Sequence, residues 1–294
     1  MLSSDLMQRI RLLELLSRRL VNNSFAGAYH SVFKGRGMAF DAVRPYQPGD
    51  DVRDIDWNVT ARSDEAYVKS YVEERELTVI LVLDASASCL FGTQVRSKRD
   101  LAAEIGAVLA LSAIANNDRV GLLIFSDTIE RYIPPRKGRN HVLRLIRELM
   151  ATPPANKGTD IRLALQSLSR MLKQKAIIFL LSDFLAPVDV YKSQLLVVGQ
   201  KHDLIAVMLS DPLEMQWGDA GLVALRDAET GEETVVDTTS KIWRREFGKQ
   251  TAQFYEQRDA SFRRAGVDRI NVNAQGDYVR ALASFFHQRA RVAH

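Results

Sequence analysis

The stretch T-V-I-L-V-L-D-A-S-A-S, residues 78–88, decides the fold. Its first part is an unbroken β-branched and aliphatic run, which is typical of a strand that is covered on both faces. The run ends in Asp84, Ser86 and Ser88, so polar side chains begin where the strand stops. The segment therefore predicts a buried strand that carries an aspartate and two serines to the edge of a sheet.

Apolar runs of the same kind alternate with amphipathic helical patterns along the rest of the chain. Strands are expected at 119–125, 128–133, 176–182, 203–209 and 267–272. Helices are expected at 97–115, 140–150, 160–173, 188–199, 241–265 and 277–290. Buried strands that alternate with helices predict an α/β fold with a doubly wound, mostly parallel sheet. A β-hairpin, with Gly231 in its turn, is expected as an insertion near 222–237.

The first 75 residues follow a different pattern from the remainder of the chain. Residues 5–23 have the leucine spacing of an amphipathic helix, and residues 66–72 alternate as a strand does. The stretch between them is rich in turn residues and favours short extended pieces. We therefore expect an N-terminal annex of helix and irregular β-structure at 1–75, followed by the α/β domain at 76–294.

Composition narrows the classes of function. The 294 residues carry 40 Lys and Arg against 36 Asp and Glu, a net charge of +4, and 46% of them are hydrophobic. This is a globular composition, and its small basic excess does not favour nucleic acid as a partner. The basic clusters, among them Arg96, Lys98 and Arg99, are expected on solvated faces.

The single cysteine and the lack of long apolar runs indicate the cellular compartment in which the protein is expected. Cys89 has no partner for an intramolecular disulfide, which fits a reducing environment, and we expect it to be a small buried filler. No apolar run approaches the roughly 20 residues that span a bilayer. The N-terminus has no apolar stretch of the signal-peptide kind. The expectation is a cytoplasmic protein without a membrane span.

Three segments are expected to meet at the carboxyl ends of the strands, where doubly wound sheets form their sites. They are D-A-S-A-S at 84–88, N-K-G-T-D at 156–160 and S-D-F at 182–184. Their side chains offer carboxylate and hydroxyl oxygens, which suit Mg²⁺ or Mn²⁺ better than zinc. The alternative is that these groups only cap helices, and Asp160 is well placed as the N-cap of the helix at 160.

The same residues carry a resemblance. D-x-S-x-S after the first strand, a threonine in a loop before a later helix and an aspartate after the fourth strand resemble the metal-ion-dependent adhesion site of von Willebrand factor A-type domains. R-P-Y-Q-P-G-D-D-V-R-D-I-D-W-N-V-T-A-R at 44–62, followed by V-E-E-R-E-L-T-V-I-L-V-L-D-A-S-A-S at 72–88, resembles a bacterial domain-of-unknown-function family encoded beside MoxR AAA+ ATPases. This second resemblance is most specific over about residues 30–90.

The resemblance implies an A-type domain that works with a MoxR-type ATPase in the assembly or maturation of a client protein. The metal ligands that it implies are Asp84, Ser86, Ser88, Thr159 and Asp183. Asp160 matches no required position in that pattern.

The segment at 44–62 mixes charges of both signs. Its acids are Asp50, Asp51, Asp54 and Asp56, with Arg44, Arg53 and Arg62 among them. They can form a second cation site or a salt-bridged scaffold. We favour the scaffold, because ion-pair networks are the commoner origin of such clusters. Trp57 is expected to anchor this scaffold to the core.

Two functions of different class fit these features. The first is a binding module, not an enzyme, in which the incompletely neutralised ion accepts a carboxylate from a partner. The alternative is a Mg²⁺-dependent phosphohydrolase with Asp84 as nucleophile. That chemistry needs a second aspartate two residues later, where this chain has Ser86, and a lysine that the sequence does not make obvious. We therefore favour the binding module.

Overall fold

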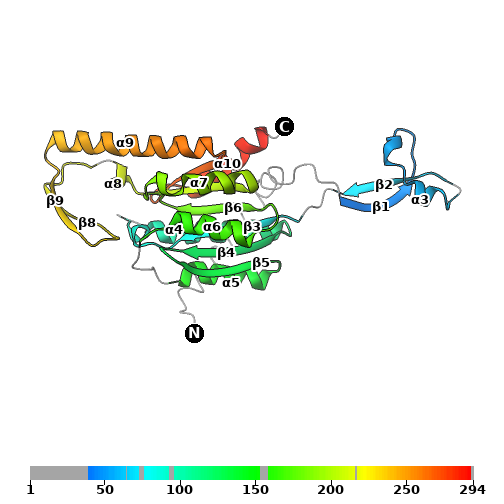
Figure 1. The fold of residues 1–294 in the computed structure, drawn as a ribbon, viewed down its shortest axis with the longest axis horizontal. Coiled ribbons are helices and arrows are strands. Elements are labelled where there is room, and N and C mark those ends of the chain that lie inside the picture. The colour runs from blue at the N-terminus through cyan, green and yellow to red at the C-terminus, as the bar shows by residue number, and fades with distance from the viewer. Residues whose placement is uncertain are drawn as a thin grey trace.

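A six-stranded sheet with helices on both sides forms the body of the protein (Figure 1). The structure is a computed structural model that describes residues 39–63, 65–72, 76–92, 96–152, 158–215 and 217–292. The helix expected at 5–23 lies outside these residues. Among the described helices, none combines the length and the apolar character that crossing a membrane requires.

The strand order of the sheet is β10-β7-β6-β3-β4-β5. The parallel strands are β3 (Thr78–Asp84), β4 (Arg119–Phe125), β6 (Ile177–Ser182), β7 (Asp203–Ser210) and β10 (Asp268–Asn273). The edge strand β5 (Ile129–Arg136) pairs antiparallel with β4. The predicted α/β class and mostly parallel sheet are confirmed.

The side chains of β3 explain why its sequence is apolar at every position from Val79 to Leu83. Val79, Leu81 and Leu83 pack into the core on one face. The helices of that face are α4 (Lys98–Ala115), α5 (Arg139–Ala151) and α10 (Tyr278–Val292). Ile80 and Val82 pack into the core on the other face. Its helices are α6 (Ile161–Met171), α7 (Val188–Lys201) and α9 (Lys241–Arg264).

The order of the strands reverses at β3. The chain passes from β3 through α4 to β4 on one side, and β6 pairs with β3 on the other side. The loops that follow β3 and β6 therefore leave the sheet in neighbouring positions at the same edge. This is the place where ligands bind in open α/β sheets.

Two further pieces follow β7 in the sequence. A short helix, α8 (Pro212–Met215), was not expected from the pattern. The hairpin of β8 (Leu222–Arg226) and β9 (Glu233–Asp237) forms as expected, and Gly231 in its turn has a φ of 75°. Such a left-handed conformation favours glycine.

The signature segment belongs to a separate two-stranded sheet of β1 (Ala39–Pro45) and β2 (Tyr67–Val72). The connection between them includes η2 (Val52–Asp54) and α3 (Trp57–Thr60), which are capped by Asp51 and Asp56. Arg44 donates to both carboxylate oxygens of Asp50, at 2.7 and 2.6 Å. Asp51 and Asp56 thus serve as caps, and Asp50 serves as an ion-pair partner.

The prediction that Trp57 anchors this segment to the core is wrong. Its side chain is 67% exposed. The reason is that α3 is a single turn, and none of its residues is buried. A helix of this length has no apolar face with which to dock its tryptophan.

Candidate metal centre

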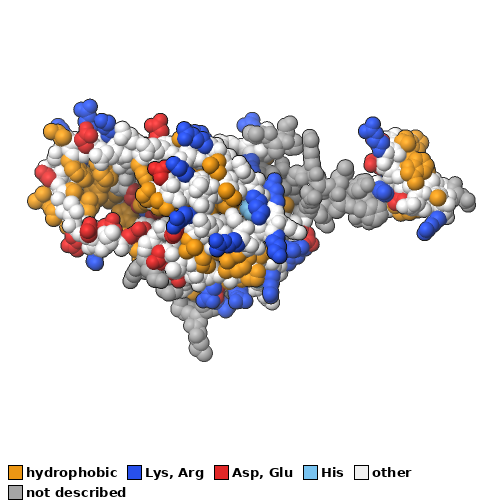
Figure 2. Space-filling model, viewed as in Figure 1, with side chains coloured by type: hydrophobic (Ala, Val, Ile, Leu, Met, Phe, Trp, Pro, Cys, Tyr) orange, Lys and Arg blue, Asp and Glu red, His pale blue; other side chains and the backbone are white. Residues whose placement is uncertain are grey.

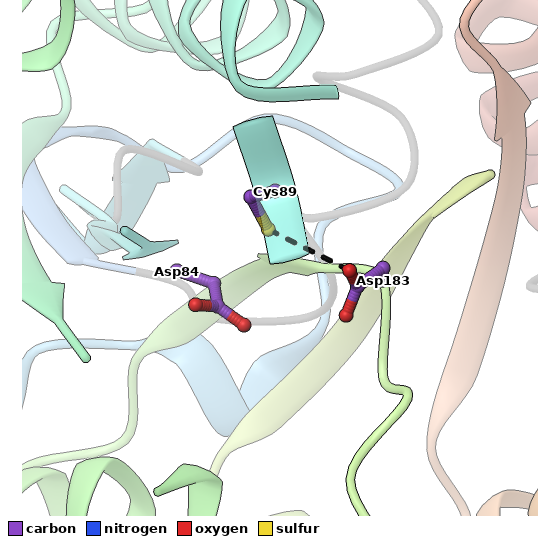
Figure 3. A group of neighbouring side chains, drawn as sticks. All are labelled: Asp84, Cys89 and Asp183. Atoms are coloured by element: carbon purple, nitrogen blue, oxygen red, sulfur yellow. Dashed lines mark hydrogen bonds between the residues drawn. The ribbon is translucent and has the colours of Figure 1, made fainter. Parts of the chain in front are cut away.

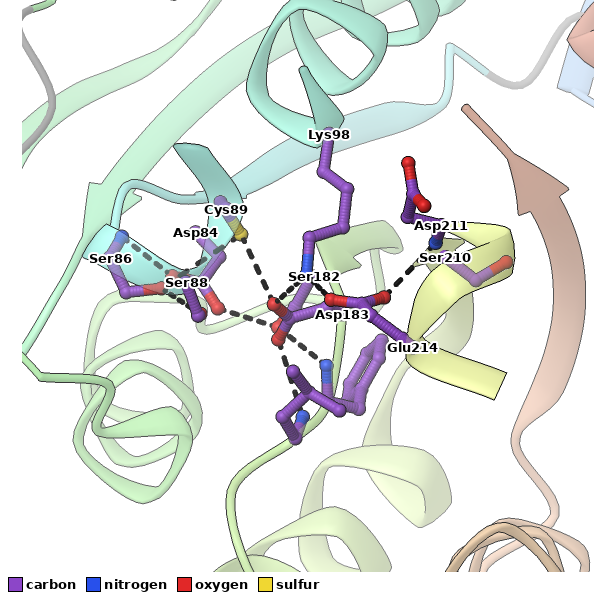
Figure 4. A network of polar contacts seen from close by, with 12 residues as sticks. Asp84, Ser86, Ser88, Cys89, Lys98, Ser182, Asp183, Ser210, Asp211 and Glu214 are labelled. Atoms are coloured by element: carbon purple, nitrogen blue, oxygen red, sulfur yellow. Dashed lines mark hydrogen bonds and ion pairs between the residues drawn. The ribbon is translucent and has the colours of Figure 1, made fainter. Parts of the chain in front are cut away.

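Asp84 lies at the carboxyl end of β3 and is completely buried. Its Oδ1 accepts the backbone N–H of Ser86 at 2.9 Å, and its Oδ2 accepts the hydroxyl of Ser182 at 2.5 Å (Figure 4). Since Ser182 ends β6, the carboxylate is held between two neighbouring strands. The sequence placed Asp84 at this edge correctly.

Ser86 and Ser88 continue the chain across the same edge. Their hydroxyl oxygens lie 3.1 Å apart. Ser86 is the N-cap of η3 (Ala87–Leu90), but its side chain makes no capping hydrogen bond. The alternative that it is only a helix cap is therefore not supported, and its hydroxyl remains near Asp84 and Ser88.

Asp183 follows β6 and is 3% exposed. Its Oδ1 accepts the N–H of Leu185 at 3.2 Å, and its Oδ2 accepts the ammonium of Lys98 at 2.7 Å. The next residue, Phe184, has a φ of 53°, which is uncommon for a residue with a side chain. Its ring is buried and packs edge-on against Phe262, with centroids 5.1 Å apart. This packing holds the turn that directs Asp183 toward the site.

Asp84 and Asp183 come together with Cys89 in a buried group (Figure 3). One ligand atom from each lies within 4.8 Å of the others. Burial, reinforced by the Asp183 carboxylate, raises the pKa of Asp84 to about 6. Two buried carboxylates at this separation repel each other, and a bound cation would relieve that repulsion.

The thiol of Cys89, the chain's only cysteine, belongs to the same buried group. It lies 3.9 Å from Asp183 Oδ2 and is buried, as expected. Burial, together with the negative charges of Asp84 and Asp183, raises its pKa well above the usual range. The thiol therefore keeps its proton at neutral pH, and metals bind the thiolate. The donor set is thus mainly carboxylate and hydroxyl oxygen, which fits Mg²⁺ or Mn²⁺.

Lys98 and Glu214 belong to the site although the sequence did not indicate either. Lys98 extends from the first turn of α4, is fully buried, and lies between Asp183 and Glu214 of α8 (Figure 4). Burial opposes its charge, but the two carboxylates outweigh this effect and raise the pKa of Lys98. The ammonium partly neutralises the acids of this edge.

The expectation that Arg96, Lys98 and Arg99 form a solvated cluster is therefore wrong for the last two. Arg99 is 7% exposed and donates to the carbonyl oxygens of Leu149 and Thr152. Both cations lie at the start of α4, which the β3–α4 connection places against the acidic edge of the sheet. The chain does supply a buried lysine, although Ser86 still occupies the position where a phosphohydrolase needs its second aspartate.

Thr159 lies in the loop that precedes α6. The N–H of Asp160 donates to the carbonyl of Ser126 at 2.9 Å, which ties this loop to the end of β4. Asp160 caps α6 as predicted, since it accepts the N–H of Leu163 at 2.8 Å. The hydroxyl of Thr159, however, donates to Glu229 of the hairpin at 2.8 Å. The structure thus brings together Asp84, Ser86, Ser88 and Asp183, and it gives Thr159 a different partner.

Several solved structures are similar to this chain. BatB from Bacteroides thetaiotaomicron aligns with a TM-score of 0.47 and 16% identity over 73% of this chain and 99% of that protein. An aerotolerance-related membrane protein from Bacteroides fragilis aligns with a TM-score of 0.45 and 17% identity, covering 74% and 99%. The SpRpn10 VWA domain aligns with a TM-score of 0.38 and 9% identity, covering 72% and 95%.

Sequence relatives cover nearly the whole chain. Uncharacterized proteins of Mycobacterium tuberculosis and Mycobacterium bovis are each 31% identical over 288 residues, which is 97% of this chain and 90% of theirs. The family model described as "Protein of unknown function DUF58" matches residues 42–257, which include the signature segment, the site and the hairpin. The chain belongs to the DUF58 family.

Proposed function

We propose that this protein is a metal-dependent binding module, in which a Mg²⁺ or Mn²⁺ ion captures a carboxylate from a partner protein. The ion would be held by Asp84, Ser86, Ser88 and Asp183, with Thr159 as the further ligand that the resemblance implies. The observation that carries this proposal is the buried Asp84–Asp183 pair beside two serine hydroxyls. Because Asp183 is already partly neutralised by Lys98, the two carboxylates would leave a divalent ion electrophilic, and an acidic side chain would complete its ligands.

The arrangement of Asp84 supports binding over catalysis. Both of its carboxylate oxygens already accept hydrogen bonds, from Ser86 and Ser182, which lowers their nucleophilicity. The nearby Cys89 thiol is held in its protonated form and is a poor nucleophile. We therefore propose that the protein has no catalytic activity of its own.

The proposed partners are a MoxR-type AAA+ ATPase and a client protein whose assembly or maturation it assists, in the cytoplasm. The resemblance of residues 44–62 to the family encoded beside such ATPases supports this choice. Figure 2 shows groups of Lys and Arg side chains among hydrophobic and acidic ones on one face of the body, and such groups would suit acidic side chains of a partner. The lone, buried Cys89 is compatible with a reducing compartment.

A binding assay with a matched control tests this proposal. The purified MoxR-type ATPase of the same genome is passed over the immobilised protein in Mg²⁺ or in EDTA. Asp84→Asn removes a carboxylate of the site, whereas Glu76→Gln removes an exposed one just before β3, at its opposite end. We expect capture in Mg²⁺ by the wild type and by Glu76→Gln only. Capture that survives EDTA or Asp84→Asn would contradict the proposal.

A further inference from the structure

The tip of the β8–β9 hairpin has a defined shape. Asp227 Oδ1 accepts the backbone N–H groups of Glu229 and Thr230, at 2.8 and 2.7 Å. Gly231 closes the turn with its positive φ, and its N–H donates to the carbonyl of Asp227 at 2.9 Å. These bonds fix the backbone from which the side chain of Glu229 extends.

Glu229 reaches the loop that carries Thr159. Its Oε1 accepts the Thr159 hydroxyl at 2.8 Å. Its Oε2 lies 3.3 Å from the position that a Cβ on Gly158 would occupy. Glycine at this position thus leaves room for the carboxylate. A hairpin from a distant part of the sequence thus places an acid on the loop that Asp160 ties to the end of β4, the strand next to β3.

This carboxylate has no counter-charge within the described part of the chain. None of the ion pairs among those residues includes Glu229. The Thr159–Glu229 bond is exposed, and an exposed acid without a cation gains little from a single hydroxyl donor. A cation bound at the carboxyl edge of the sheet would supply the charge that this carboxylate lacks.

We infer that Glu229 is the chain's own carboxylate for the metal centre and holds the place that a partner's acidic side chain takes. This inference rests on the function proposed above and adds the hairpin as a competitor. A partner would offer an aspartate or glutamate and displace the hairpin tip. Selectivity for partners would then depend on how well the partner's carboxylate competes with Glu229. Glu229 belongs to the same chain as the site, so it is present there at a high effective concentration.

Mn²⁺ titration calorimetry, with and without excess acetate, tests the role of Glu229. Glu229→Gln removes the carboxylate, and Glu232→Gln removes another exposed carboxylate of the same loop. We expect Glu229→Gln to weaken Mn²⁺ binding about fivefold or more, the scale of typical coupling between sites. Acetate should restore the affinity of Glu229→Gln and have little effect on the wild type or on Glu232→Gln.

Hydrogen exchange at the hairpin tip gives a second readout. Mn²⁺ should slow exchange of the Glu229 and Thr230 amides in the wild type and in Glu232→Gln, but not in Glu229→Gln. Equal Mn²⁺ affinity in wild type and Glu229→Gln, with no acetate effect, would overturn the role of Glu229 and leave the metal centre standing. If the wild type binds no Mn²⁺, the metal centre itself is refuted, and this inference with it.

Discussion

At the scale of single residues, Asp84 carries an electrostatic cost in the absence of a cation. Burial and the neighbouring Asp183 raise its pKa to about 6. The folded state therefore holds a proton on Asp84 at pH values where the unfolded chain has lost it. Between about pH 4 and pH 6, the free energy of unfolding of the metal-free protein should fall as the pH rises. Well above pH 6, Asp84 is ionised in the folded and in the unfolded state, so the full destabilisation by its buried charge is present.

Asp84→Asn should relieve this cost, because the amide keeps the shape without the charge. In EDTA at pH 8 we expect the variant to be more stable than the wild type by about 1–3 kcal/mol, from the size of the pKa shift. Below pH 4 the two should converge, and in Mg²⁺ at pH 8 the wild type should gain stability that the variant does not. Urea unfolding followed by circular dichroism measures each case. A variant less stable than the wild type in EDTA at pH 8 would contradict this account.

Removing the charge of Lys98 should change the free energy of unfolding in the opposite direction from removing the charge of Asp84. Its ammonium is the buried cation between Asp183 and Glu214, so Lys98→Met leaves both acids without it. Breaking a buried ion pair on one side costs about 3–5 kcal/mol. The control is Lys192→Met, which breaks an exposed pair with Asp189 and should cost under about 1 kcal/mol. Similar unfolding free energies for the two variants would show that the Lys98 cluster is not a buried ion pair.

At the scale of elements, the helices and strands of the body followed from periodicity. The continuous apolar run of β3 and the leucine spacing of α4 both reflect burial against a fixed partner. The four-residue α8 was missed because it is too short to show a period. Trp57 was misplaced for a related reason, since a large aromatic side chain predicts burial only where its element has a face to dock.

Two glycines distinguish a packed helix face from an open one. A Cβ on Gly199 of α7 would lie 2.7 Å from the carbonyl oxygen of Ala265, just after α9. Gly248 of α9 has nothing within 4 Å of the same position. Gly199→Ala should therefore destabilise the fold by about 1–3 kcal/mol through overpacking. Gly248→Ala should stabilise it by about 0.5–1 kcal/mol.

Thermal or urea unfolding of the two alanine variants measures this difference directly. The helix propensity of alanine favours both substitutions equally, so only the contact with Ala265 separates them. If Gly199→Ala proves as stable as Gly248→Ala, the close approach of α7 to the end of α9 is not present in solution.

At the scale of the whole molecule, the parallel arrangement of the strands made the positions of some site residues predictable from the sequence. The carboxyl ends of β3 and β6 share one edge, so Asp84 and Asp183 had to be neighbours once the sheet was recognised. The pairing of Lys98 with Glu214, and of Thr159 with Glu229, could not be foreseen. Both depend on how α8 and the hairpin fold back over that edge, which local sequence patterns do not encode.

The central claim is that this edge of the sheet binds a divalent cation through Asp84. Titration calorimetry with Mn²⁺ at neutral pH, on the wild type, Asp84→Asn and Glu76→Gln, tests it most directly. The account predicts saturable binding to the wild type and to Glu76→Gln, and at least a tenfold loss, about 1.4 kcal/mol, in Asp84→Asn. Absence of binding to the wild type, or equal binding to Asp84→Asn, would contradict it.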